Sequence, residues 1–115
     1  MKLMMHVLKK NLKEKLDNES ATFDMLKDKL EEEFKEVVQA IDNYSKCKSV
    51  SNLILLVGEI FDLIQMCIAL LYKCHRRAQD HECPTLIYDV NIRHKNKLVA
   101  RGWIFKTGIE IDVKE

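Results

Sequence analysis

Apolar residues recur every three or four positions through the first half of the chain, which is the spacing of an amphipathic helix. The pattern in residues 1–17 consists of Met1, Met5, Leu8, Leu12 and Leu16. It is interrupted at residues 17–20, which favour turns and helix caps. It then continues through Phe23, Leu26, Leu30, Phe34, Val37, Ile41 and Tyr44. The sequence therefore predicts an N-terminal helix over residues 1–17 and a second helix of about 22 residues, roughly 33 Å long.

Residues 53–72 are apolar on almost every side, and their only charged members are Glu59 and Asp62. A helix of this kind lies either in a protein core or in a membrane. Because a carboxylate at the centre of a bilayer costs about 2.5 to 3.5 kcal/mol, we expect a buried central helix. Ser49 or Ser51 can cap it. The short connection before it, residues 46–50, favours antiparallel packing against the preceding helix.

Basic residues dominate the next region, since residues 73–101 contain seven Lys and Arg against three Asp and Glu. Pro84 and Thr85 predict the start of a last helix over residues 86–100, and Gly102 predicts its end. In the tail, residues 103–115, apolar and acidic residues alternate, which is typical of a short strand or hairpin arm. The apolar positions of this expected C-terminal β segment are Ile109, Ile111 and Val113.

The composition fits one mostly helical domain. The chain has 115 residues, of which 47% are hydrophobic and 7% aromatic, with only 3 Gly and 1 Pro. So few glycines exclude the Gly-rich turns of dinucleotide-binding, P-loop and α/β-hydrolase folds. They also argue against a many-stranded sheet. We expect a single all-α domain over residues 1–115, with a helix at 1–17, a helix pair at 22–72, a basic region with the last helix at 73–102 and a tail at 103–115.

Charge and cysteine usage limit the expected partners and compartment. The 19 Lys and Arg against 18 Asp and Glu leave a net charge of +1, so no global field draws the chain to a nucleic-acid polymer or a membrane. The 4 cysteines form no CxxC pair, and no secretory leader opens the chain, so we expect reduced thiols and a cytoplasmic protein. Because so small a helical chain leaves apolar stripes uncovered, we expect self-association, as a dimer first and a tetramer second.

Two pairs of carboxylates carry the candidate chemistry. Glu33 and Glu36 stand three residues apart on the amphipathic helix, and Glu59 and Asp62 repeat this spacing on the apolar helix. The first pair alone is typical of a solvated helix face, but the second has no Lys or Arg near it, and unpaired buried charge is strongly penalised. In antiparallel helices the two pairs face each other at mid-length, where protons or a cation must neutralise them. Mg²⁺, with Mn²⁺ as a substitute, suits such oxygen ligands. Lys29, one turn before Glu33, is expected to pair with this cluster.

These residues resemble a known family. Residues 29–36 (KLEEEFKE) followed by residues 59–62 (EIFD) look like the EExxE…ExxD signature of the MazG-like all-α nucleoside triphosphate pyrophosphohydrolases, which include dimeric dUTPases and dCTP pyrophosphatases. The resemblance covers residues 23–103. Its last part, residues 94–98 (HKNKL) and 101–103 (RGW), is similar to the basic closing segment of small phage and bacterial members. The resemblance implies a four-helix-type bundle that is completed by oligomerisation.

The resemblance also implies an activity. A nucleoside triphosphate such as dUTP, dCTP or a non-canonical nucleotide would be hydrolysed between its α and β phosphates to a monophosphate and diphosphate. The implied Mg²⁺ ligands are Glu33, Glu36, Glu59 and Asp62. Glu32 or one of these carboxylates would accept the proton of the attacking water. The candidates for binding substrate phosphates are Lys95, Lys97 and Arg101, which are otherwise a basic helix face.

Two alternatives stay open at this point. The first is a non-enzymatic helical interaction or oligomerisation module, in which the acidic residues form a structural polar layer. The second lies within the same family and is an enzyme for phosphoribosyl-ATP or for modified nucleotides. The interaction module predicts no metal-dependent stability and no turnover. A substrate panel distinguishes the enzymes within the family.

Overall fold

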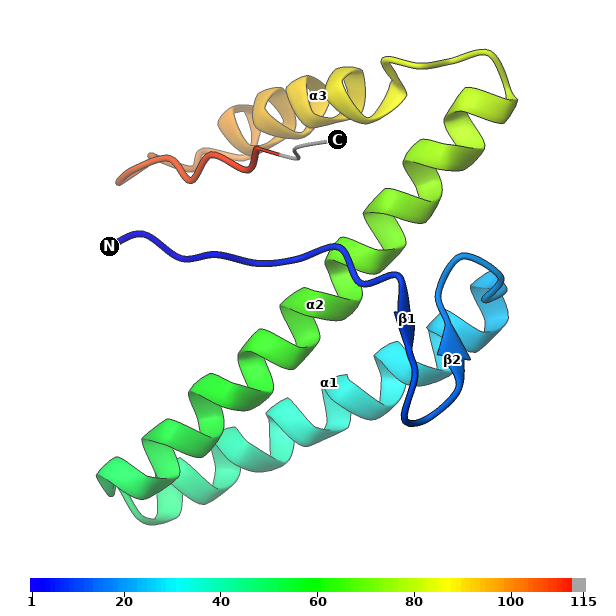
Figure 1. Cartoon of the computed structure of the whole chain (residues 1–115). Coiled ribbons are helices and arrows are strands. Elements are labelled where there is room, and N and C mark those ends of the chain that lie inside the picture. Colours follow the sequence, from blue (N-terminus) through cyan, green and yellow to red (C-terminus); the bar gives the residue numbers. More distant parts are fainter. Residues whose placement is uncertain (113–115) are drawn as a thin grey trace.

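The computed structural model describes residues 1–112, and within them the chain is mostly helical. A two-stranded hairpin, β1 (Lys10–Asn11) and β2 (Leu16–Asp17), precedes three helices: α1 (Phe23–Lys46), α2 (Val50–Asp80) and α3 (Leu86–Ala100). α1 and α2 run antiparallel from a short loop, and α3 turns back from the far end of α2 (Figure 1). The expected all-α character and the three helices between residues 22 and 102 are confirmed.

Capping hydrogen bonds set the starts of the two long helices. α1 begins after Thr22, whose Oγ1 accepts a hydrogen bond from the Met25 backbone N at 3.1 Å. α2 begins after Ser49, whose Oγ accepts one from the Asn52 backbone N at 3.1 Å. Each bond satisfies a backbone donor that the first helical turn leaves open. Of the two serines that the sequence offers for this cap, the structure uses Ser49.

Gly102 ends α3 as predicted. Its φ of 87° lies in the left-handed region, which a glycine adopts without strain. The next residue, Trp103, donates its backbone N–H to the carbonyl of Leu98 at 3.1 Å. This pair of features is the Schellman arrangement that closes many helices, so the last helix ends where the glycine permits the turn.

Residues 1–17 do not form the predicted N-terminal helix. Residues 1–9 are extended, and the hairpin that follows pairs Lys10 with Asp17 and Asn11 with Leu16. The Asn11 Oδ1 accepts hydrogen bonds from the backbone N–H groups of residues 13 and 14, both at 3.0 Å. These bonds close a turn that competes with helical hydrogen bonding. The prediction was wrong because so short a helix has little stability of its own, and the turn at Asn11 outweighs the apolar spacing.

The expected C-terminal strand is also absent from the described residues. Residues 103–112 carry no strand, and Ile109 and Ile111 are exposed. Val113, the third apolar position of the predicted segment, lies outside the described residues. An alternating sequence is stable as a strand only when a neighbouring strand takes up its backbone hydrogen bonds, and residues 101–112 have no such neighbour.

The single chain has a small apolar core. Among residues 1–112 the buried apolar side chains are Ala21, Leu26, Val37, Ala40 and Ala78. The radius of gyration is 16.7 Å, compared with about 13 Å for a compact domain of about 100 residues. The helical hairpin is therefore open rather than wrapped around a core.

α2 is not the buried central helix that the sequence predicts. Ala78 is its only buried residue among those described, and Ile54 and Leu55 are 65% and 63% exposed. One antiparallel partner and a short third helix have too little surface to cover a helix that is apolar on all sides. By length and composition alone, α2 also qualifies as a helix that could cross a membrane.

Candidate metal centre

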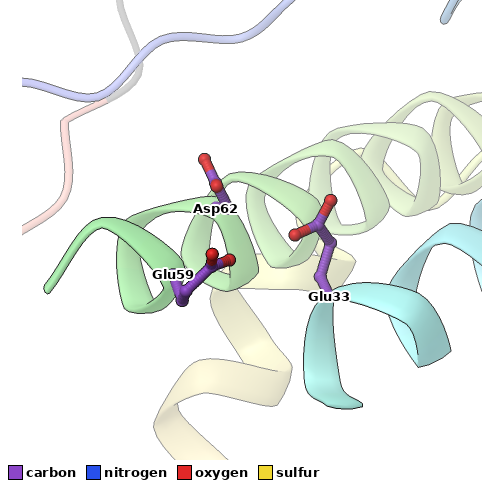
Figure 2. A group of neighbouring side chains, drawn as sticks. All are labelled: Glu33, Glu59 and Asp62. Carbon is purple, nitrogen blue, oxygen red and sulfur yellow. The ribbon is translucent and has the colours of Figure 1, made fainter. Parts of the chain in front are cut away.

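Three carboxylates meet where α1 and α2 pack at mid-length. Glu33 of α1 and Glu59 and Asp62 of α2 each offer one oxygen, and these three oxygens lie within 4.8 Å of one another. Figure 2 shows Glu33 reaching from α1 toward α2, where Glu59 and Asp62 project from neighbouring turns. Three of the four predicted metal ligands are thus brought together.

The antiparallel hairpin explains this meeting. Glu33 lies 13 residues before Lys46, the end of α1, and Asp62 lies 12 residues after Val50, the start of α2. Because both helices rise 1.5 Å per residue from the same short loop, the two residues stand at the same level. Their closeness follows directly from helix length and loop length, which is why the sequence pattern could predict it.

Two oxygens of this trio are buried and unsatisfied. Glu33 is 8% exposed, and its Oε2 has no hydrogen-bond partner among residues 1–112. The Oε2 of Glu59 is likewise buried without a described partner. An unpaired buried carboxylate oxygen is unfavourable, because it has lost its water and gained nothing in exchange. The two oxygens therefore mark a place that a proton or a cation would stabilise.

Lys29 neutralises the other side of the Glu33 carboxylate. Its Nζ lies 3.2 Å from Glu33 Oε1 and 3.4 Å from Glu32 Oε1, so the predicted pairing of Lys29 with the cluster is confirmed. Burial raises the pKa of Glu33 above its ordinary value of 4.5, while the hydrogen bond from Lys29 lowers this pKa and the nearby Glu36 raises it. The pKa of Lys29 is raised in turn, mainly by its hydrogen bond to Glu33.

The remaining two predicted acidic residues lie beside the trio. Glu36 is exposed and stands outside the group of three oxygens, so the predicted convergence of four carboxylates is met only for three. One turn beyond Glu33 on α1, it lines a cavity of about 210 Å³ together with Glu59. Glu32 is exposed and is paired with Lys29. Successive turns of α1 place both residues beside the trio, and Glu36 forms a side-chain hydrogen bond with Glu33 that raises the pKa of Glu33.

The predicted phosphate-binding cations lie on or just after α3. Lys95, Lys97 and Arg101 are all exposed, and none of them forms an ion pair with a carboxylate in the described part of the chain. α3 packs against α2 and makes no packing contact with α1, the helix that carries Glu33. Within one chain these cations therefore lie on or beside a helix that does not pack against α1, the helix of Glu33.

Gln65 is a residue near the trio that the sequence reasoning missed. It lies three residues after Asp62 on α2, and its Nε2 donates a hydrogen bond to the backbone carbonyl of His6. This bond ties the N-terminal segment across the middle of α2 (Figure 1). Gln65 is the only side-chain amide among residues 53–72, and that isolated polar group on an apolar helix is the signal that could have revealed it.

Comparisons of the chain with protein-family models, with curated proteins and with solved structures find no match. The family resemblance drawn from the residues therefore stays a prediction. The support for a function comes from the geometry and burial of the three carboxylates.

Proposed function

We propose that the chain is a Mg²⁺-dependent nucleoside triphosphate pyrophosphohydrolase. The observation that supports this proposal most is the trio of Glu33, Glu59 and Asp62, two of which have a buried, unpartnered oxygen. Opposite ligands of an octahedral Mg²⁺ stand about 4.2 Å apart, so oxygens within 4.8 Å of one another need only small shifts to fit. The all-carboxylate donor set also favours Mg²⁺ or Mn²⁺ over Zn²⁺.

A metal ion held there would neutralise the trio, bind phosphate oxygens of the substrate and lower the pKa of a coordinated water. Glu33, Glu59 and Asp62 are the residues that would hold it, with Glu36 next to Glu59 as the fourth ligand. In the proposed reaction, a water oxygen bonds to phosphorus while the bridge between the α and β phosphates breaks. The products are a nucleoside monophosphate and diphosphate.

The attacking water needs a proton acceptor near the trio. Glu32 and Glu36 are the two flanking carboxylates, and their surroundings differ. Glu32 is 58% exposed and is already paired with Lys29. Glu36 and Glu59 both line a cavity of about 210 Å³. A general base must lie in hydrogen-bond reach of the attacking water. We propose Glu36 for this role, as a carboxylate that also belongs to the metal site, because Glu32 is already paired with Lys29.

The exposed apolar faces support a homo-oligomer as the working form. Phe34 on α1 is 57% exposed and Ile54 on α2 is 65% exposed, although both belong to helices that carry the trio. A second copy that covers these faces would complete a four-helix-type bundle. It would also supply an α3 whose Lys95, Lys97 and Arg101 approach the carboxylates of the first copy. We propose a cytoplasmic dimer, or a tetramer made from two such dimers.

The uncovered face of α2 also favours a second candidate function. A non-enzymatic helical interaction module would use the same apolar face to assemble, and the trio would be a polar layer inside the assembled bundle. This candidate predicts that replacing a carboxylate by an amide increases stability, because it removes buried charge. It also predicts that divalent ions change neither stability nor assembly.

The experiment that tests the proposed function is product identification with a panel of canonical and modified ribo- and deoxynucleoside triphosphates, with Mg²⁺ or with EDTA. We expect a monophosphate and diphosphate in equal amounts, only with the metal, and for a subset of the nucleotides. Running the reaction in ¹⁸O-labelled water shows which phosphorus the water attacks, because the label appears in that product. Release of a nucleoside diphosphate and inorganic phosphate, or no cleavage of any nucleotide, contradicts the proposal.

A further inference from the structure

A second cavity, of about 480 Å³, opens between the N-terminal segment, the end of the β hairpin and the C-terminal half of α2. Its size falls in the range of roughly 300 to 1,000 Å³ that small-molecule sites occupy. Leu26 and Ala69 line it, and each lies two helical turns, about 10 Å, further from the α1–α2 loop than Glu33 and Asp62 do. The cavity is therefore separate from the carboxylate trio.

The wall of this cavity is basic. Its lining includes the cations of Lys9, Lys73, Arg76 and Arg77 against the two carboxylates of Glu19 and Asp80. This excess of positive charge contrasts with a chain whose net charge is only +1. The carboxylate trio is negatively charged and the wall of this cavity is positively charged. The two sites therefore select different ligands: the trio attracts a cation, and the basic cavity attracts an anion.

The cations of the cavity keep free hydrogen-bond donors. Lys73 donates to the carbonyl of Ala21, and Arg77 Nη1 lies 2.9 Å from Asp80 Oδ2. An ammonium has three N–H donors and a guanidinium five, so both side chains have donors left. The Arg76 side chain forms no hydrogen bond or ion pair with any other residue of the described chain. Its planar guanidinium is thus available for two parallel hydrogen bonds to a phosphate.

Apart from Asn18, the rest of the lining is apolar or aromatic, and it includes one aromatic ring. Tyr72 lies one residue before Lys73 on α2, and Leu26 of α1 lines the same cavity. An inorganic ion would leave these side chains without a partner, whereas a ligand with a planar ring would bury them. The N-terminal segment that closes the cavity is held in place, because the Asn18 side chain donates to the Leu8 carbonyl at 3.1 Å.

We propose that this cavity binds a small phosphate ester that carries a planar ring, such as a nucleoside monophosphate, and that it does so without a metal ion. Arg76 binds the phosphate, with Lys73 and Arg77 beside it, and Tyr72 contacts the ring. The proposal does not rest on catalysis at the trio. Binding in EDTA separates the two sites, because phosphate groups are repelled by the three carboxylates when no cation lies between them.

The test is isothermal titration of the full chain with uridine monophosphate in EDTA, and with uridine and inorganic phosphate as partial ligands. We expect saturable binding of one nucleotide per chain and weaker binding of either part. The variant Arg76→Ala removes the bidentate donor and should weaken binding at least about tenfold. Tyr72→Leu should weaken the nucleotide and leave the weak binding of inorganic phosphate unchanged.

Three controls make the result decisive. Arg93→Ala removes the same charge from α3, outside the cavity, and Asp62→Asn alters the trio; both should bind as the wild type does. Arg76→Lys keeps the positive charge but loses the two parallel N–H donors of the guanidinium. It should bind the nucleotide more weakly than the wild type, and this comparison is available even if Arg76→Ala fails to fold. The proposal is overturned if no nucleotide binds in EDTA, if Arg93→Ala weakens binding as much as Arg76→Ala, or if Asp62→Asn abolishes binding.

Discussion

Lys29 Nζ lies 3.2 Å from Glu33 Oε1, whereas the other oxygen of the same carboxylate, Oε2, is buried without a partner in the described chain. Lys29 therefore neutralises one oxygen of this carboxylate from within α1, while the carboxylate also offers an oxygen to the group that it forms with Glu59 and Asp62 of α2. A cation placed at the trio would neutralise the carboxylates of Glu33 and Glu59, each of which has a buried oxygen without a partner in the described chain. The following predictions test this relationship and the surfaces around it.

Divalent metal ions should stabilise the folded chain. At a free Mg²⁺ or Mn²⁺ concentration of 100 times the dissociation constant, binding to the native state alone adds about 2.7 kcal/mol. For a chain of this size that corresponds to a rise in Tm of roughly 10 °C or more. Thermal unfolding followed by circular dichroism, with metal and with EDTA, measures the shift.

Variants of the trio should lose this metal-dependent stabilisation. Glu59→Gln and Asp62→Asn each remove one ligand, whereas Glu31→Gln removes the same charge from an exposed position of α1 outside the trio. We expect the Tm shift to vanish in the first two and to persist in Glu31→Gln. An equal shift in all three variants would mean that the metal binds elsewhere.

The raised pKa of Glu33 predicts a pH dependence of stability in EDTA. Because the folded state holds this proton more tightly than the unfolded state, the free energy of unfolding falls as the pH rises from 4.5 through the raised folded value. Above the folded-state pKa of Glu33 the carboxylate is charged in the folded protein, and the full cost of burying this charge lowers the free energy of unfolding. Glu33→Gln removes the penalty, so it should be more stable than the wild type near neutral pH and gain nothing at about pH 4 and below.

Urea unfolding of both proteins across this pH range measures the difference. The comparison isolates Glu33, because every other titrating group is common to the two chains. If the wild type is instead the more stable protein at neutral pH in EDTA, the carboxylate is satisfied within the folded chain and its unpartnered oxygen needs no cation.

Removing Lys29 should affect metal binding and stability in opposite directions. Lys29→Met deletes a positive charge 3.2 Å from Glu33 Oε1, so a divalent ion would bind more tightly because it no longer competes with an ammonium. Stability in EDTA should fall by at most about 1 kcal/mol, since the Lys29 side chain is half exposed and the pair is screened by water. Lys27→Met, an exposed neighbour on α1, is the charge-matched control. Weaker metal binding in Lys29→Met would show that Lys29 positions Glu33 rather than competing for it.

The exposed face of α2 predicts self-association. Sedimentation velocity should give a species of at least twice the 13.5 kDa mass of the chain. Ile54→Lys places a charge on the uncovered face of α2 and should shift the population to monomer, whereas Ile104→Lys in the exposed tail should not. A monomeric wild type at tens of micromolar would contradict both the proposed oligomer and the interaction-module candidate.

Local spacing was sufficient to predict the three helices after residue 22 and most of the site, although the same spacing wrongly predicted a helix over residues 1–17. The apolar periodicity predicted α1 and most of α2, and Ser49 and Gly102 marked the start of α2 and the end of α3, but α2 continues to Asp80, eight residues beyond its predicted end. Equal distances from the loop brought Glu33 opposite Asp62. Glu36 was predicted as a fourth ligand because it stands three residues after Glu33, as Asp62 does after Glu59, and because the family resemblance implies it. In the structure Glu36 lies outside the group of three oxygens, although its side-chain hydrogen bond with Glu33 raises the pKa of Glu33 and it lines a cavity together with Glu59.

Other features depended on contacts between residues far apart in the sequence, which the periodicity of apolar residues does not reveal. The hydrogen bonds from Gln65 to the His6 carbonyl and from Lys73 to the Ala21 carbonyl join segments that are 59 and 52 residues apart. These bonds hold the N-terminal segment and the start of α1 against α2. The sequence pattern had instead predicted a separate helix over residues 1–17. The exposure of α2 was missed for a related reason, since periodicity identifies an apolar helix but does not count the surfaces that are present to cover it.

The most direct test of the central claim is the initial rate of diphosphate release from the cleaved nucleoside triphosphate, measured for the wild type, Glu59→Gln, Asp62→Asn and the Glu31→Gln control. We expect Mg²⁺-dependent release by the wild type and Glu31→Gln, and a loss of at least about 100-fold in both trio variants while they stay folded. Rates that are equal in all four proteins, or release that persists in EDTA, would contradict a catalytic metal site at Glu33, Glu59 and Asp62.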